Sequence, residues 1–254
     1  MPQYNNSVEN ISKILAQFSY GRPRWGISEL AKELKFPKTT AYNLVRTLEK
    51  IGFLVLNENN RKYELGKRIA NLASIMVANL DINKKGAGLA QELARTYDLG
   101  CSIGIWGEDA VLMVFSSTWH NIPEFRNFKA GPRIEAYCSA LGRSMLAYFE
   151  NKEIKRYLDN ANLFKFTPKT KIKKPEILNE LVKTKARGFS IIDEELSPGG
   201  ASFGAPIFDK NGSVLGAISI YGYTDRILGP DKQKIINSLC FKALQISQRF
   251  GYGV

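Results

Sequence analysis

The stretch ISELAKELKFPKTTAYNLVRTLEKIGF, residues 27–53, constrains the fold of this chain more than any other. It predicts two short helices joined by a turn at Lys35-Phe36, because apolar residues recur in it at helical spacing. Ser28 suits the cap of the first helix, and Pro37 suits the first position of the second. The inner faces of the two helices contain Leu30, Ala31 and Leu34, then Ala41, Leu44, Val45 and Leu48.

The opposite face of the second predicted helix is polar. It carries Lys38, Thr39, Tyr42, Asn43 and Arg46. A helix that buried this face would have to desolvate a lysine, an arginine and several hydrogen-bonding groups. We therefore expect this face to be exposed, either to solvent alone or to a partner outside the chain.

The segments around this pair of helices complete a small domain. Residues 8–18 have an apolar stripe after Ser7, which predicts another helix. After Gly52, the run FLVLNENNRKYEL predicts a hairpin with its tip at residues 57–61. Three helices followed by a hairpin describe a winged helix-turn-helix, which we place at residues 1–65.

Charge separates this domain from the rest of the chain. The formal net charge is +12, and residues 1–68 hold 12 Lys/Arg against 6 Asp/Glu. Half of the excess therefore lies in about a quarter of the sequence. A concentrated basic charge favours a phosphate-bearing partner, although many solvated domains are also basic.

Residues 66–84 predict a connecting helix whose apolar face is available for a partner or for the following domain. From residue 85 to 254 strands alternate with helices, and Asp209-Lys210-Asn211-Gly212 marks a hairpin turn. This pattern predicts an α/β domain of the α+β type, an antiparallel sheet flanked by helices. The runs at 165–175 and at Asp193-Glu194-Glu195 are expected to be solvated.

The cysteines and the histidine limit the kinds of site that the chain can form. Cys101, Cys138 and Cys240 are far apart and His120 is the only histidine, so the sequence indicates no disulfide framework, metal site or cofactor. The first residues do not have the pattern of a signal peptide, and no apolar run is long enough to span a bilayer. We expect a cytoplasmic protein.

In order along the chain, both halves resemble the IclR family of bacterial transcriptional regulators. SVENISKILAQF is similar to the family's first helix, residues 27–55 to its helix-turn-helix, and RKYELGKRIANLA to its wing and linker. SALGRSMLA and GGASFGAPIFDKNGSVLGAISIYG resemble its GAF-like effector-binding domain. Ile192 and Phe203 depart from the family signature, which has an acidic or hydroxyl residue and a smaller aliphatic there. The resemblance implies double-stranded operator DNA, a small-molecule effector and a homodimer or homotetramer as partners.

For DNA binding, the N-terminal end of the second helix would enter the major groove. Asn43 and Arg46 are candidates for base readout, because Asn pairs with adenine and Arg with guanine. Thr39, Thr40 and Tyr42 would reach phosphate or base edges. Lys38, with Arg61 and Lys62 of the wing, would hold backbone phosphates.

For the effector, the resemblance implies a site on one face of the sheet. The positions that match it are Arg126, Ser139, Ala140, Leu141, Gly142, Ile192, Gly200, Ser202, Ser219 and Tyr221. Arg126 and the backbone amides of 139–142 would receive a carboxylate. Because Ile192 and Tyr221 replace polar or small residues, we expect an acid with an apolar or aromatic portion.

Three other functions compete with this interpretation. Cys138 could make the chain a thiol-based redox regulator, Ser202 near Glu194 and Glu195 could indicate a hydrolase, and the basic charge could serve non-specific DNA binding. No motif for nucleophilic catalysis accompanies Ser202, so we expect no enzyme. The effector, the operator, the sign of regulation and the choice between dimer and tetramer stay open.

Overall fold

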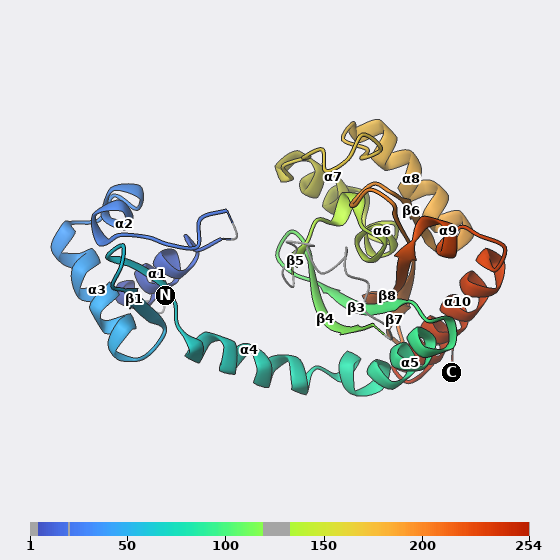
Figure 1. The fold of residues 1–254 in the computed structure, drawn as a ribbon, viewed down its shortest axis with the longest axis horizontal. Helices are drawn as coiled ribbons and strands as arrows, with labels where there is room; N and C mark the ends of the chain where they lie inside the picture. Colours follow the sequence, from blue (N-terminus) through green and yellow to red (C-terminus); the bar gives the residue numbers. More distant parts are fainter. Residues whose placement is uncertain (1–4, 20, 119–132, 254) are drawn as a thin grey trace. The chain divides into compact units, whose positions relative to one another are not determined.

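The computed structural model describes residues 5–19, 21–118 and 133–253. These residues form two compact units, 1–78 and 79–254, which are described separately. The architecture is mixed α/β, with a helix-turn-helix unit followed by an antiparallel sheet with helices on both faces, which confirms the predicted fold class (Figure 1). No helix in the described part of the chain is long and apolar enough to cross a membrane.

The first unit contains three helices, α1 (Asn6–Leu15), α2 (Ile27–Glu33) and α3 (Lys38–Lys50). Three predicted helix starts are wrong by one or two residues. α1 begins at Asn6 with Asn5 as its N-cap, whereas the sequence predicts a start after Ser7. α2 begins at Ile27 rather than after Ser28, because the Glu29 carboxylate accepts a hydrogen bond from the Gly26 N–H at 2.8 Å. Pro37 is the N-cap, with φ −53° and ψ 136°, and Lys38 is the first helical residue of α3.

The wing is a hairpin of β1 (Leu54–Asn57) and β2 (Lys62–Leu65), closed by the tip residues predicted from the sequence. Arg61 ends the tip with a positive φ of 54°, which allows the chain to turn back into β2. Trp25 adds a bridge on the other side of β2: Trp25 and Tyr63 exchange backbone hydrogen bonds of 3.0 and 2.8 Å. The core beneath these elements contains Ile14, Trp25, Leu30, Val45, Leu48, Leu54 and Tyr63.

The segment 66–84, expected as one helix, contains two. α4 (Lys67–Asn79) ends before Leu80, which has extended backbone angles, and α5 (Asp81–Tyr97) begins directly after it. α4 buries none of its residues within the described part of the chain, whereas α5 buries a stripe that includes Leu89 and Leu93. The apolar face expected on the connector therefore belongs to α4.

The second unit is built on a six-stranded antiparallel sheet in the order β5-β4-β3-β8-β7-β6. Its strands are β3 (Gly100–Trp106), β4 (Val111–Ser117), β5 (Arg133–Ile134), β6 (Ser190–Asp193), β7 (Gly200–Phe208) and β8 (Val214–Tyr223). β3 and β8 are the two central strands, and the predicted turn at 209–212 joins β7 to β8 in a hairpin.

Helices cover both faces of this sheet (Figure 1). α5 and α10 (Lys232–Gln248) pack on one face, and the short α9 (Thr224–Ile227) precedes α10. The other face holds the 3₁₀ turn η2 (Ala136–Cys138), α6 (Ala140–Leu146), α7 (Asn151–Asn160) and α8 (Lys174–Arg187). The approach of α6 is close because Gly204 has no side chain: a Cβ there would lie 2.4 Å from the Ala140 carbonyl oxygen.

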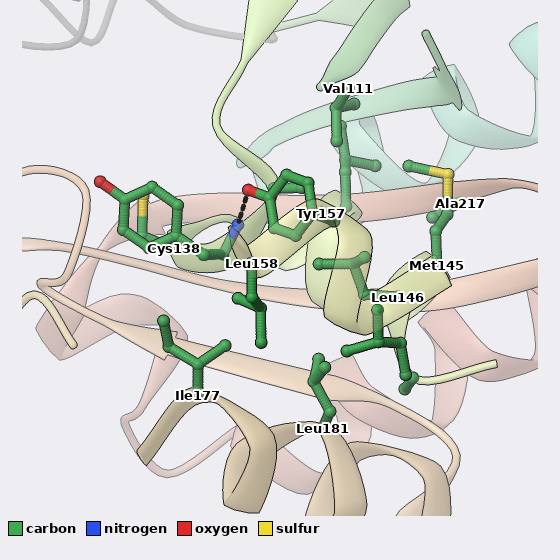
Figure 2. Close-up of a cluster of buried hydrophobic side chains, with 14 residues drawn as sticks. Val111, Cys138, Met145, Leu146, Tyr157, Leu158, Ile177, Leu181 and Ala217 are labelled. Carbon is green, nitrogen blue, oxygen red and sulfur yellow. Dashed lines mark hydrogen bonds between the residues drawn. The ribbon is translucent and has the colours of Figure 1, made fainter. Parts of the chain in front are cut away.

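The core between α6, α7, α8 and the sheet is shown in Figure 2. Leu158, Ile177 and Leu181 reach it from the outer helices, and Met145 and Leu146 from α6. The Tyr157 hydroxyl in this core accepts a hydrogen bond of 3.0 Å from the Tyr137 N–H. This core fixes α6 in place, together with its N-terminal turn.

The basic run at 165–175 was expected to be solvated, and this is wrong for part of it. Thr167 and Thr170 are buried, and their hydroxyls each donate a hydrogen bond of 2.6 Å to the carbonyls of Glu194 and Glu195 respectively. The expectation that Glu195 lies in solvent is also wrong, since only 2% of its side chain is exposed. The run therefore forms a strap across the end of β6.

Candidate DNA interface and effector site

The exposed face of α3 is the candidate DNA interface. Ala41, Val45 and Leu48 are buried on the opposite side, as their spacing predicts. We call the exposed side the recognition face and define it as Thr39, Tyr42, Asn43 and Arg46, all exposed to solvent. Tyr42 is the clearest sign of an unusual surface, because a large aromatic side chain here is 51% exposed.

Lys38 and Thr40 flank the recognition face at the start of α3. Lys38 is exposed and Thr40 is half-buried. Lys50 is exposed near the other end of the same face, one turn beyond Arg46, and the sequence analysis did not include it. Lys50 is four residues from Arg46 and seven from Asn43, and this helical spacing is the signal that places it on the same face.

Three of the side chains predicted to contact DNA form ion pairs with carboxylates of the same unit. Arg46 pairs with Glu49 at 2.6 Å within α3, and Arg61 pairs with Glu58 at 2.8 Å at the wing tip. The pair at the wing tip is an ordinary exposed pair that can open at little cost, since both of its side chains are about three-quarters exposed.

Lys62 is the third, and its Nζ lies 2.8 Å from Glu29 Oε1. Glu29 also accepts a hydrogen bond from the Gly26 N–H, and this bond, followed by the one from Lys62, lowers the pKa of the Glu29 carboxyl to about 2. The pair joins the wing to the start of α2. Lys62 is therefore oriented by the fold rather than left as a mobile cation.

The candidate effector site is on the sheet face that carries α6. Residues paired directly across antiparallel strands lie on the same face. Ile192 pairs with Ser202, and Ser202 pairs with Tyr221 on β8. Gly200 and Ser219 share this face by strand alternation. We call these residues the effector face: Ile192, Gly200, Ser202, Ser219 and Tyr221.

Two serines that the sequence analysis missed complete this face. Ser102 of β3 is paired with Ser219, and their buried hydroxyls lie 2.8 Å apart. The Tyr221 hydroxyl lies 3.1 Å from the hydroxyl of Ser116 on β4. The Tyr221 ring crosses β3 because Gly100 leaves room for it: a Cβ on Gly100 would lie 2.3 Å from a ring carbon. The missed residues become visible only when the strand register is known.

The predicted segment 139–142 caps α6 above this face. Ser139 is the N-cap, and its hydroxyl accepts a hydrogen bond of 3.2 Å from the Gly142 N–H. That amide is consequently engaged within the chain. Ala140 and Leu141 are buried next to the sheet, with Leu141 close to Gly104. Arg126 lies outside the described residues.

The groups behind the competing functions have other roles in the fold. Cys138 is fully buried, and burial raises the pKa of its thiol to about 12, so the reactive thiolate is disfavoured at neutral pH. Glu195 accepts hydrogen bonds from Arg143 and Lys171, and Glu194 accepts one from Lys169. These cations engage both carboxylates that the sequence places near Ser202.

Comparison with known proteins agrees with this arrangement. Residues 7–58 match the model of the IclR helix-turn-helix domain, and residues 75–248 match that of the bacterial transcriptional regulator IclR C-terminal domain. The transcriptional regulator XynR of Escherichia coli K12 is 24% identical over 247 residues, which cover 97% of each chain.

Two solved structures extend the likeness to the fold. An IclR-type transcriptional regulator from Silicibacter sp. TM1040 matches with a TM-score of 0.81 and 24% identity, covering 98% of this chain and 97% of that one. An IclR homolog from Microbacterium hydrocarbonoxydans, solved in complex with 4-hydroxybenzoate, matches with a TM-score of 0.73 and 18% identity, over 97% and 99% of the two chains.

The winged helix-turn-helix and its polar recognition face define a DNA-binding transcriptional regulator. More narrowly, the two matching family models cover nearly the whole chain. The chain belongs to the IclR family of bacterial transcriptional regulators.

Proposed function

We propose that this regulator binds a two-fold symmetric operator through α3 and that a small organic acid changes this binding. The observation that carries the DNA part is the recognition face, where Tyr42, Asn43 and Arg46 stay exposed on the side of α3 opposite its buried stripe. In a helix-turn-helix such a face lies in the major groove.

The side chains of the first unit are proposed to have two different roles, base reading and phosphate binding. Asn43 and Arg46 are the proposed base readers, for adenine and guanine respectively. Lys38 and the hydroxyls of Thr39 and Thr40 are placed at the start of α3, where free N–H groups and the helix dipole favour phosphate. Arg61 and Lys62 of the wing are proposed to hold backbone phosphates after exchanging their carboxylate partners for DNA.

A single unit of this size reads few base pairs, so specificity requires two copies. α4 is the proposed contact between them. Its Leu72 and Met76 are about half exposed, and α4 buries no residue in the described part of the chain. The domain limits proposed from the sequence, 1–65, 66–84 and 85–254, place this contact in the linker.

The proposed effector is a carboxylic acid with an apolar or aromatic portion. The effector face supports this choice, because it combines hydroxyl groups of Ser202 and Ser219 with the apolar Ile192 and the ring of Tyr221. Tyr221 already fills part of the face near Gly100. The relative from Microbacterium hydrocarbonoxydans, complexed with 4-hydroxybenzoate, supports an acid of this size.

The two sites are proposed to be coupled. An effector that binds one arrangement of the dimer or tetramer more tightly shifts the population towards it, and so changes the spacing of the two α3 helices. Couplings of this kind are about 1–3 kcal/mol, which changes DNA affinity by roughly 5- to 150-fold.

Selection from random-sequence duplexes tests the DNA part. We expect a preferred site with two-fold symmetry. Asn43→Ala should reduce discrimination at one base pair of each half-site. Lys38→Ala should weaken binding to all sequences and lower the salt slope by about one. Uniform binding to every duplex by the wild-type protein would contradict the proposal.

Calorimetry with a panel of acids tests the effector part. We expect 4-hydroxybenzoate-sized aromatic acids to bind more tightly than glyoxylate, and Ser202→Ala to weaken that binding without lowering the melting temperature of the free protein. Tight binding of glyoxylate together with no binding of the aromatic acids would contradict the proposal.

A further inference from the structure

A carboxylate lies beside the recognition face. Glu49 lies one turn after Arg46 on α3, and its Oε2 is 2.6 Å from Arg46 Nη1. The same Oε2 is 3.5 Å from the Tyr63 hydroxyl, which approaches from β2 of the wing. Arg46 is 52% exposed, Glu49 is 26% exposed and Tyr63 is buried. The three side chains thus form a line from the core to the recognition face.

The rigid end of this line is Tyr63. Its ring belongs to the core of the first unit. Its backbone N–H and carbonyl both form hydrogen bonds with Trp25, and it lies opposite Leu56 in the hairpin. The hydroxyl therefore has a defined position. The Tyr63 hydroxyl, followed by the Glu49 carboxylate, raises the pKa of Arg46, so both groups favour the charged guanidinium.

An isolated surface pair of this kind contributes little to stability. Its position gives it another consequence. Arginine carries five N–H donors in a planar fork, and a bidentate contact with guanine O6 and N7 needs only two of them. The pair with Glu49 uses Nη1, so a second edge of the guanidinium can face the duplex.

We propose that Glu49 is a positioning residue for base readout, holding the guanidinium of Arg46 in the orientation in which it meets the guanine edge. Tyr63 sets the position of Glu49 and so links the wing to the recognition face. The inference deepens the proposed function and rests on Arg46 acting as a base reader. Its physical basis is preorganisation, since a side chain already ordered in the free protein loses less rotamer entropy on binding.

Glu49 also has effects that oppose DNA binding. A carboxylate near the duplex repels phosphate, and it competes with DNA for Arg46. If repulsion and competition dominate, removing Glu49 strengthens binding to all sequences by the same factor. If positioning dominates, removing it weakens discrimination at one base pair only. The two effects differ in which duplexes they change.

The test measures affinities of the full chain for its selected duplex and for every single-base variant of one half-site. The proteins are wild type, Arg46→Ala, Glu49→Ala and Arg46→Ala/Glu49→Ala. Glu180→Ala is the matched control, because Glu180 also forms an i,i+3 pair, with Lys183 on α8, and its removal changes the net charge equally. Thermal melting establishes that each variant is folded.

We expect Arg46→Ala to lower discrimination at one base pair by about 5- to 100-fold. Glu49→Ala should lower discrimination at that same base pair by about 2- to 10-fold, which corresponds to the cost of ordering one long side chain. The double variant should discriminate no worse than Arg46→Ala. Glu180→Ala should discriminate as the wild type does.

Two results overturn the inference in distinguishable ways. In the first, Arg46→Ala lowers discrimination at one base pair, while Glu49→Ala either shifts all affinities equally or lowers discrimination further in the double variant by its full single-variant factor. The positioning role of Glu49 then fails, and the role of Arg46 as a base reader stands. If Arg46→Ala itself weakens all sequences equally, Arg46 binds phosphate, and both the proposed reader and the role of Glu49 fail. Tyr63→Phe, which keeps the ring in the core, should give a smaller loss at the same base pair.

Discussion

Arg143 and Glu195 form a bidentate ion pair inside the second unit, with Nη1–Oε1 and Nη2–Oε2 distances of 2.7 and 2.6 Å. Neither side chain is more than 2% exposed. Burial alone would raise the pKa of Glu195, but hydrogen bonds from Arg143 and Lys171 outweigh it and lower this pKa. Arg143 Nε also donates to the Tyr137 carbonyl at 2.8 Å. The pair therefore connects α6, the turn before it and the end of β6.

Removing the arginine should be costly. Arg143→Met leaves Glu195 buried with Lys171 as its remaining cation, and breaking a buried pair on one side costs about 3–5 kcal/mol. Urea denaturation of the full chain would measure this loss. Arg156→Met, on the exposed side of α7, is the control and should change the unfolding free energy by less than about 0.5 kcal/mol. Equal losses of unfolding free energy from the two substitutions would show that the buried pair contributes no more to stability than an exposed arginine does.

Glycine substitutions test the packing of α6 against the sheet. Gly204→Ala would place a methyl group 2.4 Å from the Ala140 carbonyl oxygen and 2.7 Å from Ser144 Oγ, so the helix must move. We expect a loss of about 1–3 kcal/mol. Gly88→Ala is the matched change, because a Cβ on this exposed residue of α5 meets nothing within 4 Å and should stabilise the helix by about 0.5–1 kcal/mol. Stabilisation by both would contradict the close approach.

The Glu29 carboxylate, which accepts hydrogen bonds from the Gly26 N–H and from Lys62, predicts a pH dependence of this part of the first unit. The pKa of Glu29 is lowered from 4.5 to about 2 in the folded chain, so its contribution to stability is present above about pH 4.5 and is lost as the pH falls towards 2. Hydrogen exchange of peptides covering 25–65 should show wild type better protected than Glu29→Gln at pH 6, with the difference shrinking at lower pH. A difference in protection that grows as the pH falls would contradict the lowered pKa of Glu29.

The buried thiol predicts resistance to alkylation. Cys138 is fully buried and burial raises its pKa to about 12, while Cys240 is only partly buried. Iodoacetamide at pH 8 should therefore modify Cys240 first, and peroxide should leave DNA binding of the native chain unchanged. Rapid labelling of Cys138, with loss of DNA binding that Cys138→Ser abolishes, would restore the redox interpretation.

Local patterns predict much of this fold. The stripes of α2 and α3, the hairpin tip at 57–61 and the turn at 209–212 each have a signal within a few residues, and the structure contains all of them. α7 has a weaker local signal. Ile154, Tyr157 and Leu158 follow helical spacing, but this short apolar stripe stands among charged residues.

The remaining features depend on contacts between distant segments. Glu195 belongs to an acidic run in the sequence, and its burial depends on Arg143, 52 residues earlier, and Lys171, 24 residues earlier. Ser102 and Ser219 are 117 residues apart and meet only through strand register. The pairing of Arg46 with Glu49 has a local signal at i,i+3, whereas the contribution of Tyr63 from the wing has none.

A photocrosslink from Tyr42 tests the central claim most directly. The side chain is 51% exposed on the recognition face, so p-benzoylphenylalanine can replace it without disturbing the core. Phe241 of α10, 58% exposed in the second unit, takes the same replacement as a control. We predict that irradiation with the selected duplex crosslinks the chain to DNA from position 42 and not from position 241. Crosslinking from position 241 alone, or equally from both, would contradict the account.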